Sequence, residues 1–419
     1  MNADQTTQGA AAREPRVLHL VTSPLSTVLM RGQLRYLSEN GFEVLLASAP
    51  GPQLQVICKT EQVEASEVAI DREIAPFKDF FALWRLFRLM RRLKPDITNV
   101  STPKAGLLGG LAAVLARVPC RVYTLRGLRW ETASGPKRAL LMLTEWVACR
   151  CAHRVVCVST GVREKLIATH GARRQRTLVF GSGSSNGVDA RRFVPGSQEQ
   201  ASVAVLRAQL KIPADALVVG FVGRLTRDKG VCELYESHTR LRRQFPSLRL
   251  LLAGDFEAGD RLPPAVLRSI VSDESVIRPG FVLDIADYYR VMDVFCLPTY
   301  REGFPTVALE AQASGVPVVT TTATGAIESV IDGRTGTVVP VADVESLTLA
   351  IGGLLAAPSL RLRMGRAGRE WVLEKFHPEG IWAALAAEYT QLLLSNGFAA
   401  PTQGSVSTSM TEGLRGDIP

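Results

Sequence analysis

The sequence predicts an α/β protein made of two doubly wound domains, and three observations support this prediction. Apolar, strand-like runs alternate with helical segments in both halves of the chain, and this order gives parallel sheets covered by helices on both faces. A chain of 419 residues with 46% hydrophobic content can bury more than one core. The segment from Gly181 to Gly187 is too rich in glycine and serine to pack, so we expect it to link the domains.

The expected elements follow from local patterns. Strands are short apolar runs that end at turn residues, and helices are longer segments with helical spacing of apolar positions. In the first half we expect strands at 16–21, 43–48, 95–100, from 122 and at 154–158, and helices at 29–40, 77–94 and 139–152. In the second half we expect strands at 218–222, 248–253, 276–278 and 291–297, and helices at 233–245, 264–272, 285–291 and 305–314.

Several helix ends carry recognisable signals. Gly41 ends the first expected helix, and Ser159 is an expected N-cap for the helix after the strand at 154–158. Pro305 suits the first position of a helix that ends at Gly315. The last helical stretch, 371–394, is broken near Pro378, since proline lacks the N–H that a helix interior needs.

Charge is distributed unevenly along the chain. Residues up to Pro195 carry 28 Lys and Arg against 15 Asp and Glu, a net charge of +13, whereas the remainder carries 21 and 25, a net charge of −4. This asymmetry points to nucleic acid or to an anionic membrane surface as a partner. The simpler alternative is that the basic residues only keep a domain soluble.

Composition argues against several classes of protein. No run of eighteen uncharged apolar residues occurs, so we expect no transmembrane helix, and residues 1–13 lack the apolar core of a signal peptide. We therefore expect a cytoplasmic location. The seven cysteines are odd in number and include no Cys-x-x-Cys pair, so we expect buried, reduced thiols rather than disulfides or a zinc site.

The segment from Cys296 to Glu310 holds two carboxylates eight positions apart across a strand, a loop and a helix. Glu302 directly precedes the helix, whose first N–H groups and positive dipole end favour an anion. Gly303 permits a close approach of another backbone or a ligand. Carboxylates beside an anion site fit a ligand with both an anionic part and hydroxyls, such as a sugar joined to a nucleotide diphosphate. Taken alone, two glutamates at this spacing more often belong to a solvated helix face.

These motifs resemble a known family. Glu302 to Glu310 resembles the E-x7-E signature of the retaining GT4 glycosyltransferases, which have the GT-B fold of two Rossmann-like domains that face a central cleft. Gly223 to Gly230 resembles the family's diphosphate-contacting turn, and Asn186 to Asp189 resembles its interdomain segment. The segments 313–319 and 325–328 follow in the family's order.

The resemblance implies a donor site for a nucleotide sugar, with UDP as the commoner family choice. It gives catalytic roles to Glu302, Arg224 and Lys229, where the two cations bind the diphosphate and Glu302 binds hydroxyls of the donor sugar. The other implied donor contacts are Gly223, Gly303, Phe304, Pro305, Thr306 and Glu310, the last on the ribose. The leaving diphosphate gains negative charge, and no Asp-x-Asp triplet is present, so we expect cations and backbone amides to stabilise it with no metal and no other cofactor.

The resemblance also divides the chain. We expect tails at 1–14 and 397–419, an acceptor-binding Rossmann-like domain at 15–190, a nucleotide-sugar-binding Rossmann-like domain at 191–376, and a C-terminal helix at 377–396 that packs back on the first domain.

Polar residues near strand ends of the first half predict an acceptor site. Ser23 stands where the family carries a glycine-rich loop, and Lys104 begins a helix that suits a phosphate. Arg126 and Arg129 lie where many relatives carry a histidine, and arginine cannot act as a base at neutral pH. We expect these four residues to bind an anionic acceptor, a sugar on a polyprenyl diphosphate from surface polysaccharide or glycan assembly. The group that takes the acceptor's proton stays unassigned.

The expected helix at 77–94 is basic and amphipathic. Arg85, Arg88 and Arg92 share one side, while aromatic residues that include Phe81 and Trp84 occupy others. Such a helix can lie on an anionic membrane with its cations on the headgroups, so we expect peripheral attachment to the inner face of the cell membrane. The alternative is an ordinary helix that covers the sheet with a basic outer face, and both can hold.

Four other functions remain open from the sequence. A transferase with a soluble acceptor would share the same donor residues, and a sugar-nucleotide epimerase could share the fold. A nucleic-acid-binding protein fits the pI of about 9.4, but the chain lacks a compact recognition motif, and we expect no nucleic-acid partner. A catalytically silent binding module is the fourth, and the presence of both glutamates and both cations argues against it.

Overall fold

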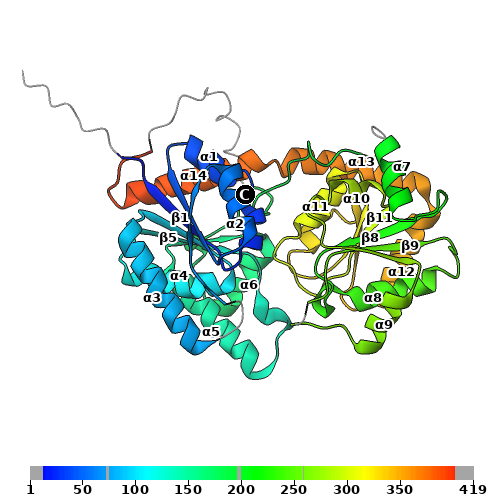
Figure 1. The fold of residues 1–419 in the computed structure, drawn as a ribbon, viewed down its shortest axis with the longest axis horizontal. Coiled ribbons are helices and arrows are strands. Elements are labelled where there is room, and N and C mark those ends of the chain that lie inside the picture. Colours follow the sequence, from blue (N-terminus) through cyan, green and yellow to red (C-terminus); the bar gives the residue numbers. More distant parts are fainter. Residues whose placement is uncertain (1–12, 72–74, 196–199, 258, 402–419) are drawn as a thin grey trace, which may run out of the picture.

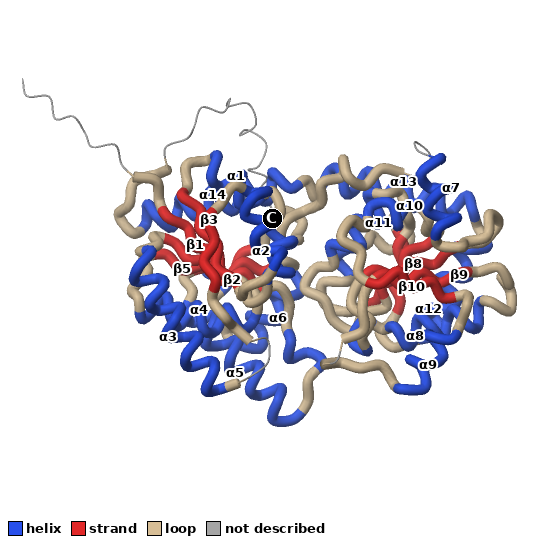
Figure 2. The backbone as a smooth tube through the Cα atoms, in the orientation of Figure 1, coloured by secondary structure: helices blue, strands red, loops and turns tan. Residues whose placement is uncertain are grey.

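The structure is a computed structural model that describes residues 13–71, 75–195, 200–257 and 259–401. Two α/β units lie side by side, and Figure 2 shows that the strands of each unit gather in its middle with helices around them. This arrangement confirms the expected fold class. Most of the two expected tails, namely residues 1–12 and 402–419, lies outside the described residues.

The first unit is built on a seven-stranded parallel sheet with the order β3-β2-β1-β4-β5-β6-β7. Its strands are β1 (Arg16–Leu20), β2 (Glu43–Ser48), β3 (Glu64–Glu67), β4 (Ile97–Ser101), β5 (Cys120–Leu125), β6 (Arg154–Cys157) and β7 (Thr177–Leu178). The chain reverses its direction across the sheet between β1 and β4, which is the point where open α/β sheets bind ligands.

Helices cover both faces of this sheet. They are η1 (Pro24–Met30), α1 (Gln33–Glu39), α2 (Pro52–Glu61), α3 (Pro76–Leu93), α4 (Pro103–Leu115), η2 (Arg129–Thr132), α5 (Gly135–Cys151), α6 (Thr160–His170) and η3 (Arg174–Arg176). Buried residues of α3, α4, α5 and α6 share one apolar core with the sheet, and those of α1 and α2 belong to the core on the other face.

The second unit has a six-stranded parallel sheet with the order β10-β9-β8-β11-β12-β13. Its strands are β8 (Val218–Val222), β9 (Arg249–Ala253), β10 (Val276–Gly280), β11 (Val294–Leu297), β12 (Val318–Thr321) and β13 (Gly336–Val339). Its helices are α7 (Gln200–Gln209), η5 (Arg227–Lys229), α8 (Val231–Leu241), α9 (Pro264–Ser272), α10 (Ala286–Arg290), α11 (Thr306–Ala313), η6 (Ile327–Ser329), α12 (Val344–Ala356) and α13 (Pro358–Lys375). The chain reverses its direction across this second sheet between β8 and β11.

The last helix, α14 (Pro378–Ser395), follows the second unit but packs on the first. Leu385, Tyr389 and Leu393 belong to the same buried core as α1 and α2, and the side-chain amide of Asn99 in β4 donates to the Tyr389 hydroxyl at 2.6 Å. Figure 1 shows α14 running from α13 over to the first unit. The two units are therefore joined at this helix as well as through the chain near residue 187.

Several expected elements differ from the observed ones: the helix expected at 233–245 is α8 at Val231–Leu241, and the one expected at 139–152 already begins at Gly135. Two other differences have a visible local cause. The helix expected at 29–40 is divided into η1 and α1, because Gly32 between them has a left-handed backbone with φ of +80° that an α-helix cannot contain. The strand expected at 291–297 begins only at Val294, since the N–H of Met292 still bonds the carbonyl of Tyr289 in the last turn of α10.

Among the described residues, no single helix combines the length and the apolar composition that a membrane crossing needs. One pair, Val344–Ala356 with Pro358–Ser395, reaches both only when taken together across a bend of 102°.

Candidate active site

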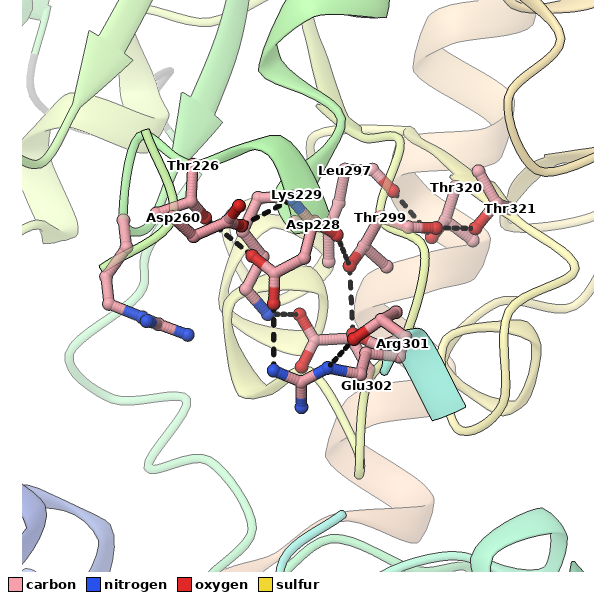
Figure 3. A network of polar contacts seen from close by, with 12 residues as sticks. Thr226, Asp228, Lys229, Asp260, Leu297, Thr299, Arg301, Glu302, Thr320 and Thr321 are labelled. Carbon is pink, nitrogen blue, oxygen red and sulfur yellow. Dashed lines mark hydrogen bonds and ion pairs between the residues drawn. The ribbon is translucent and has the colours of Figure 1, made fainter. Parts of the chain in front are cut away.

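The loop between β11 and α11 lies directly against the turn after β8. Gly230 ends that turn with φ of +71°, and a Cβ atom added to it would overlap the carbonyl oxygen of Pro298. Glycine therefore allows both the left-handed backbone and the close approach of the two segments. Figure 3 shows the result, in which Lys229 from the turn and Glu302 from the loop point toward one another.

Lys229 and Glu302 form an ion pair between Nζ and Oε1, and their side chains are only 14% and 17% exposed. Both residues follow strands, β8 and β11, that are neighbours at the reversal point of the second sheet. Because little water reaches the pair, its attraction is screened less than that of a surface pair. The site thus holds an ammonium group for an anion and a carboxylate for hydroxyls within reach of each other.

Asp228 fixes the relative position of these two segments. Its carboxylate accepts hydrogen bonds from the Thr226 hydroxyl at 2.6 Å and from the Arg301 guanidinium at 2.9 Å. Its backbone carbonyl accepts from the Tyr300 N–H at 2.9 Å and from the Thr299 hydroxyl at 3.1 Å. Figure 3 shows Asp228 between the turn and the loop. Asp228 therefore positions Glu302 through the residues just before it, a role that the sequence did not reveal.

Glu310 lies inside α11 and accepts a hydrogen bond from the Tyr289 hydroxyl at 2.8 Å. Burial raises the pKa of the Glu310 carboxyl, and the positive charges of Arg192 and Arg31 oppose that rise. Arg31 belongs to the first unit, so Glu310 lies where the two units meet. Tyr289 leaves the second oxygen of this carboxylate for another donor.

Arg224 follows β8 and forms an ion pair with Glu257, with side chains 45% and 26% exposed. Gly223 before it has φ of +148°, and a Cβ atom added to Gly254 would overlap the Gly223 carbonyl oxygen. The turn after β8 is therefore held close to the turn after β9. Arg224 is more exposed than Lys229. To contact a ligand, it would have to give up its partly exposed ion pair with Glu257.

The backbones of the two units touch at Gly303. A Cβ atom added there would overlap the carbonyl oxygen of Arg126, and one added to Gly127 would lie 3.2 Å from the Gly303 nitrogen. Next to this contact, the Phe304 ring is 9% exposed and packs 5.5 Å from the Phe376 ring, centroid to centroid. The donor loop of the second unit is thus adjacent to the predicted acceptor segment of the first.

Arg126 itself is the unusual side chain of this contact. Its Nε and Nη1 atoms are buried and have no hydrogen-bond partner within the part of the chain that the structure describes. Burial lowers the pKa of the Arg126 guanidinium to about 10, so it stays charged at neutral pH. Burial, together with the charge of Arg126, lowers the pKa of nearby His19 to about 3, so that imidazole is neutral. A buried cation without a partner is costly, and an anionic ligand would relieve that cost.

The other predicted acceptor residues are placed differently. Ser23 is the N-cap residue of η1, and Arg129 is exposed at the start of η2. Lys104 forms an ion pair with Asp79 of α3 at 2.6 Å, with side chains 10% and 19% exposed. Lys104 therefore joins α4 to α3, and the structure does not bring it together with Arg126 as an open cation.

Comparison with known proteins agrees with this geometry. Residues 10–183 match the family described as "Glycosyl transferase 4-like domain", and residues 216–357 match "Glycosyl transferases group 1". Over 381 residues the chain is 35% identical to the "Capsular polysaccharide biosynthesis glycosyltransferase CapM" of Staphylococcus aureus, which covers 91% of this chain and 98% of the relative. The chain belongs to the group 1, GT4-type glycosyltransferases.

Two further comparisons extend this result. The transferase is 26% identical over 351 residues to the "UDP-Gal:alpha-D-GlcNAc-diphosphoundecaprenol alpha-1,3-galactosyltransferase" of Escherichia coli, across 80% of this chain and 87% of the relative. Its fold is similar to Anabaena HepE solved in complex with UDP and glucose, with a TM-score of 0.74, 19% identity, and coverage of 89% of this chain and 98% of that one. The fold is therefore GT-B.

The transferase also has contacts between its units that the sequence did not indicate. The Glu328 carboxylate of the second unit accepts from the backbone N–H groups of Thr160 and Gly161 at 2.8 and 2.7 Å, at the start of α6 in the first unit. Nearby, the Thr324 hydroxyl donates to Glu131 at 2.7 Å. Glu328 lies in the segment 325–328 that follows the family's order, but no local pattern gives these pairings, because each partner comes from the other unit.

Helix α3 of the transferase combines both expected properties. Ala82, Leu86, Leu89 and Met90 are buried against the first sheet, so α3 is a sheet-covering helix. Phe81 and Trp84 are 57% and 50% exposed, and Arg88 stacks over the Trp84 ring at 4.7 Å. Arg85 and Arg92 are exposed as well. The outer surface of α3 is therefore aromatic and basic.

Proposed function

We propose that this glycosyltransferase moves a sugar, with retention of configuration, from a UDP-sugar to a sugar on a polyprenyl diphosphate during surface polysaccharide assembly. The observation that carries the proposal is that the loop holding Glu302, which pairs with Lys229, touches the backbone of Arg126 at Gly303, while two guanidinium nitrogens of Arg126 are buried without a partner among the described residues. Cations for two phosphate-bearing substrates thus flank a carboxylate that suits a sugar. The donor site lies in 191–376 and the acceptor site in 15–190. The names of the capsular and the diphosphoundecaprenol relatives support the acceptor class.

The donor diphosphate binds between Lys229, Arg224 and the N-terminus of α11. The leaving group gains negative charge as the glycosidic bond breaks, and two cations with the first amides of a helix stabilise it. This arrangement needs no metal ion. Across residues 13–71, 75–195, 200–257 and 259–401, no three His, Cys, Asp or Glu side chains converge in a way that could hold one. The complex of HepE with UDP supports UDP as the nucleotide.

The two glutamates bind hydroxyl groups. When Lys229 turns to the diphosphate, Glu302 loses its ion-pair partner and accepts hydrogen bonds from hydroxyls of the donor sugar. Glu310 accepts from the ribose, beside the hydrogen bond that it already receives from Tyr289. Hydrogen bonds to a charged acceptor are roughly twice as strong as neutral ones, so both groups orient the donor strongly. Neither carboxylate is a nucleophile, and the acceptor hydroxyl attacks from the face that the diphosphate leaves.

Arg126 binds the diphosphate of the acceptor lipid. Its guanidinium carries paired N–H donors that match two phosphate oxygens, and its buried Nε and Nη1 atoms have no other partner among the described residues. Arg129, exposed on the next turn, and Ser23 at the first-sheet reversal point contribute at the rim, and Lys104 contributes only if its pair with Asp79 opens. Arg126 is therefore the residue on which the anionic acceptor depends most.

Helix α3 holds the enzyme on the membrane that contains this acceptor. Its exposed Phe81 and Trp84 enter the interface, and its arginines contact anionic headgroups, each for about 1 kcal/mol. Replacement of Arg85, Arg88, Arg91 and Arg92 with Gln should reduce flotation with anionic vesicles by about tenfold or more. The matched control replaces four exposed arginines of the second unit, Arg243, Arg268, Arg363 and Arg366, with Gln. If the test and control variants lose flotation equally, α3 does not hold the enzyme on the membrane.

The function itself is tested by transfer of label from UDP- and GDP-sugars into a bacterial polyprenyl-lipid extract with EDTA present. Label in the organic phase that disappears with Glu302→Ala supports the donor site, the lipid acceptor and metal independence together. Glu236→Gln, which removes the same charge from an exposed pair on α8, should leave the rate unchanged. Nucleotide release only with soluble sugar acceptors would contradict the lipid acceptor and favour the soluble-acceptor transferase.

A further inference from the structure

A cavity of about 260 Å³ lies in the first unit, away from the cleft. Its walls come from the end of α5, the end of α6, η3, strand β6 and the edge strand β7. Three arginines, Arg150, Arg173 and Arg176, line it together with His170, and Trp146 and Val155 supply an apolar wall. The cavity thus combines several exposed cations with a partly apolar wall.

This cavity is separate from the donor and acceptor sites. The start of α6 faces the second unit, since Thr160 and Gly161 donate to Glu328. His170 is the last residue of that 11-residue helix, so the cavity lies roughly 15 Å further along its axis. The cleft is at the carboxyl ends of the parallel strands, and the cavity is at their amino ends. A ligand there would not touch the transferring groups.

The three arginines have no carboxylate partner in the part of the chain that the structure describes. Among the described residues, none of their guanidinium groups has an ion pair or hydrogen bond, although Arg150 stacks over the Trp146 ring at 4.9 Å. Neighbouring arginines differ, because Arg174 pairs with Glu164 and Arg154 pairs with Glu388. In this part of the first unit, the arginines that line the cavity thus differ from Arg154 and Arg174, which have carboxylate partners.

The local sequence offers no acid to neutralise them. Between Ser101 and Pro195 the chain has 16 Lys and Arg but only four Asp and Glu. All four acids are already engaged: Glu131 with Lys165, Glu145 with Tyr123, Glu164 with Arg174 and Asp189 with Arg191. No carboxylate lines the cavity. The three arginines are exposed, so water and salt screen part of their mutual repulsion, and a bound anion would relieve more of it.

The helix dipole explains only part of this cluster. Arg150 and His170 lie in the last turns of α5 and α6, where the negative end of a helix attracts cations. Arg173 and Arg176 lie beyond α6, on a connecting turn, so no helix end accounts for them. Their placement calls for a ligand rather than for helix stability.

We propose that this cavity is a second anion site that binds a phosphate-bearing ligand through Arg150, Arg173 and Arg176. The planar guanidinium group presents two parallel donors that match phosphate oxygens, and the low-dielectric wall formed by Trp146 strengthens the attraction. The phosphate can belong to a lipid headgroup or to a soluble compound. Leu140, Leu143 and Trp146 on α5 are 42%, 56% and 40% exposed, so the cavity opens beside an apolar helix face that a bilayer could also contact.

The experiment has two arms on the full-length protein. The first measures binding of inorganic phosphate by calorimetry, with saturating UDP to occupy the donor cations. The second measures flotation with phosphatidylcholine vesicles that contain phosphatidic acid, in a background in which Arg85, Arg88, Arg91 and Arg92 are replaced with Gln so that α3 does not contribute. The test variant is R150Q/R173Q/R176Q, and R243Q/R363Q/R366Q on the second unit is the control with the same change in charge.

The test variant should weaken the binding of whichever probe binds by about tenfold or more, whereas the control should change it by less than about twofold. Phosphate binding in the first arm assigns a soluble ligand, and binding only to vesicles assigns a lipid headgroup. Because Arg176 is exposed, Arg176→Glu alone should reproduce the loss without risk to folding. The proposal fails if neither probe binds, or if test and control variants lose binding equally.

Discussion

Replacement of Glu302 with Gln should make UDP bind more tightly while it slows transfer. In the proposed mechanism Lys229 turns from Glu302 to the diphosphate, so the ion pair opens when the nucleotide arrives. With side chains 14% and 17% exposed, the pair lies between surface pairs and fully buried ones, and opening it costs about 1–2 kcal/mol. Gln keeps the size of the side chain but removes the competing charge. UDP affinity should therefore rise about tenfold.

Transfer should respond in the opposite direction. UDP itself has no sugar and gains nothing from Glu302, but the transferred sugar loses a charged acceptor for its hydroxyls. A loss of about 3 kcal/mol in the transition state corresponds to a rate about 100-fold lower. Calorimetry with UDP and initial rates with the UDP-sugar measure the two effects. Glu236→Gln, which breaks an exposed pair with Arg240 in α8, is the matched control and should change neither quantity.

Two results would refute this reasoning. If Glu302→Gln binds UDP as weakly as the unaltered enzyme or more weakly, Lys229 does not exchange the carboxylate for the diphosphate. If the variant transfers sugar at the normal rate, Glu302 does not contact the donor. A Lys229→Met variant should lose UDP affinity by about tenfold, which separates the loss of the cation from the loss of its competitor.

Three other predictions follow from side chains described above. Gly303→Ala should lower the transfer rate about 100-fold, because the added methyl group forces apart the contact with Arg126. The control is Gly353→Ala at an open helical position, which should keep the rate and add about 0.5–1 kcal/mol of stability. Initial rates and thermal melts measure both effects. Arg126→Met should raise the free energy of unfolding by about 1–2 kcal/mol because it removes a buried charge without a partner, yet reduce transfer to the anionic acceptor; a variant that is less stable would contradict this. Burial raises the pKa of Glu145, which accepts from Tyr123, from 4.5 to about 7, so the stability of the folded state is full below the unfolded value and declines as pH rises through 7. Glu145→Gln lacks this dependence and should be about 2–3 kcal/mol more stable than the unaltered protein at pH 8 but equal at pH 4, in denaturant titrations at both values.

The sequence predicted the parts of the fold that depend on local pattern. The helix expected at 264–272 coincides with α9, and the strand at 218–222 coincides with β8, since apolar periodicity and flanking turn residues specify both. Gly32 was the signal that divides η1 from α1, but a glycine in a helical pattern does not reveal its φ angle. The start of β11 at Val294 depends on the pairing with β8, which no local pattern contains.

The site was predictable where its residues lie in one motif. Glu302 and Lys229 were identified from two short motifs at strand ends, and their pairing follows from the parallel order of β8 and β11. Tyr289, the partner of Glu310, was not identified, because it reaches α11 from a separate helix. Lys104 was read as an open cation because its partner Asp79 lies 25 positions earlier, on another helix.

The contact between Glu328 and the first N–H groups of α6 affects how easily the two units move apart. A helix of the first unit obtains two of its first hydrogen-bond acceptors from the second unit, so separation of the units uncaps that helix. A carboxylate cap is worth about 0.5–2 kcal/mol, and this amount becomes part of the preference for the closed state. The amide protons of Thr160 and Gly161 should therefore exchange with deuterium faster when the units spend more time apart. Hydrogen exchange at the start of α6 thus reports the separation of the two units.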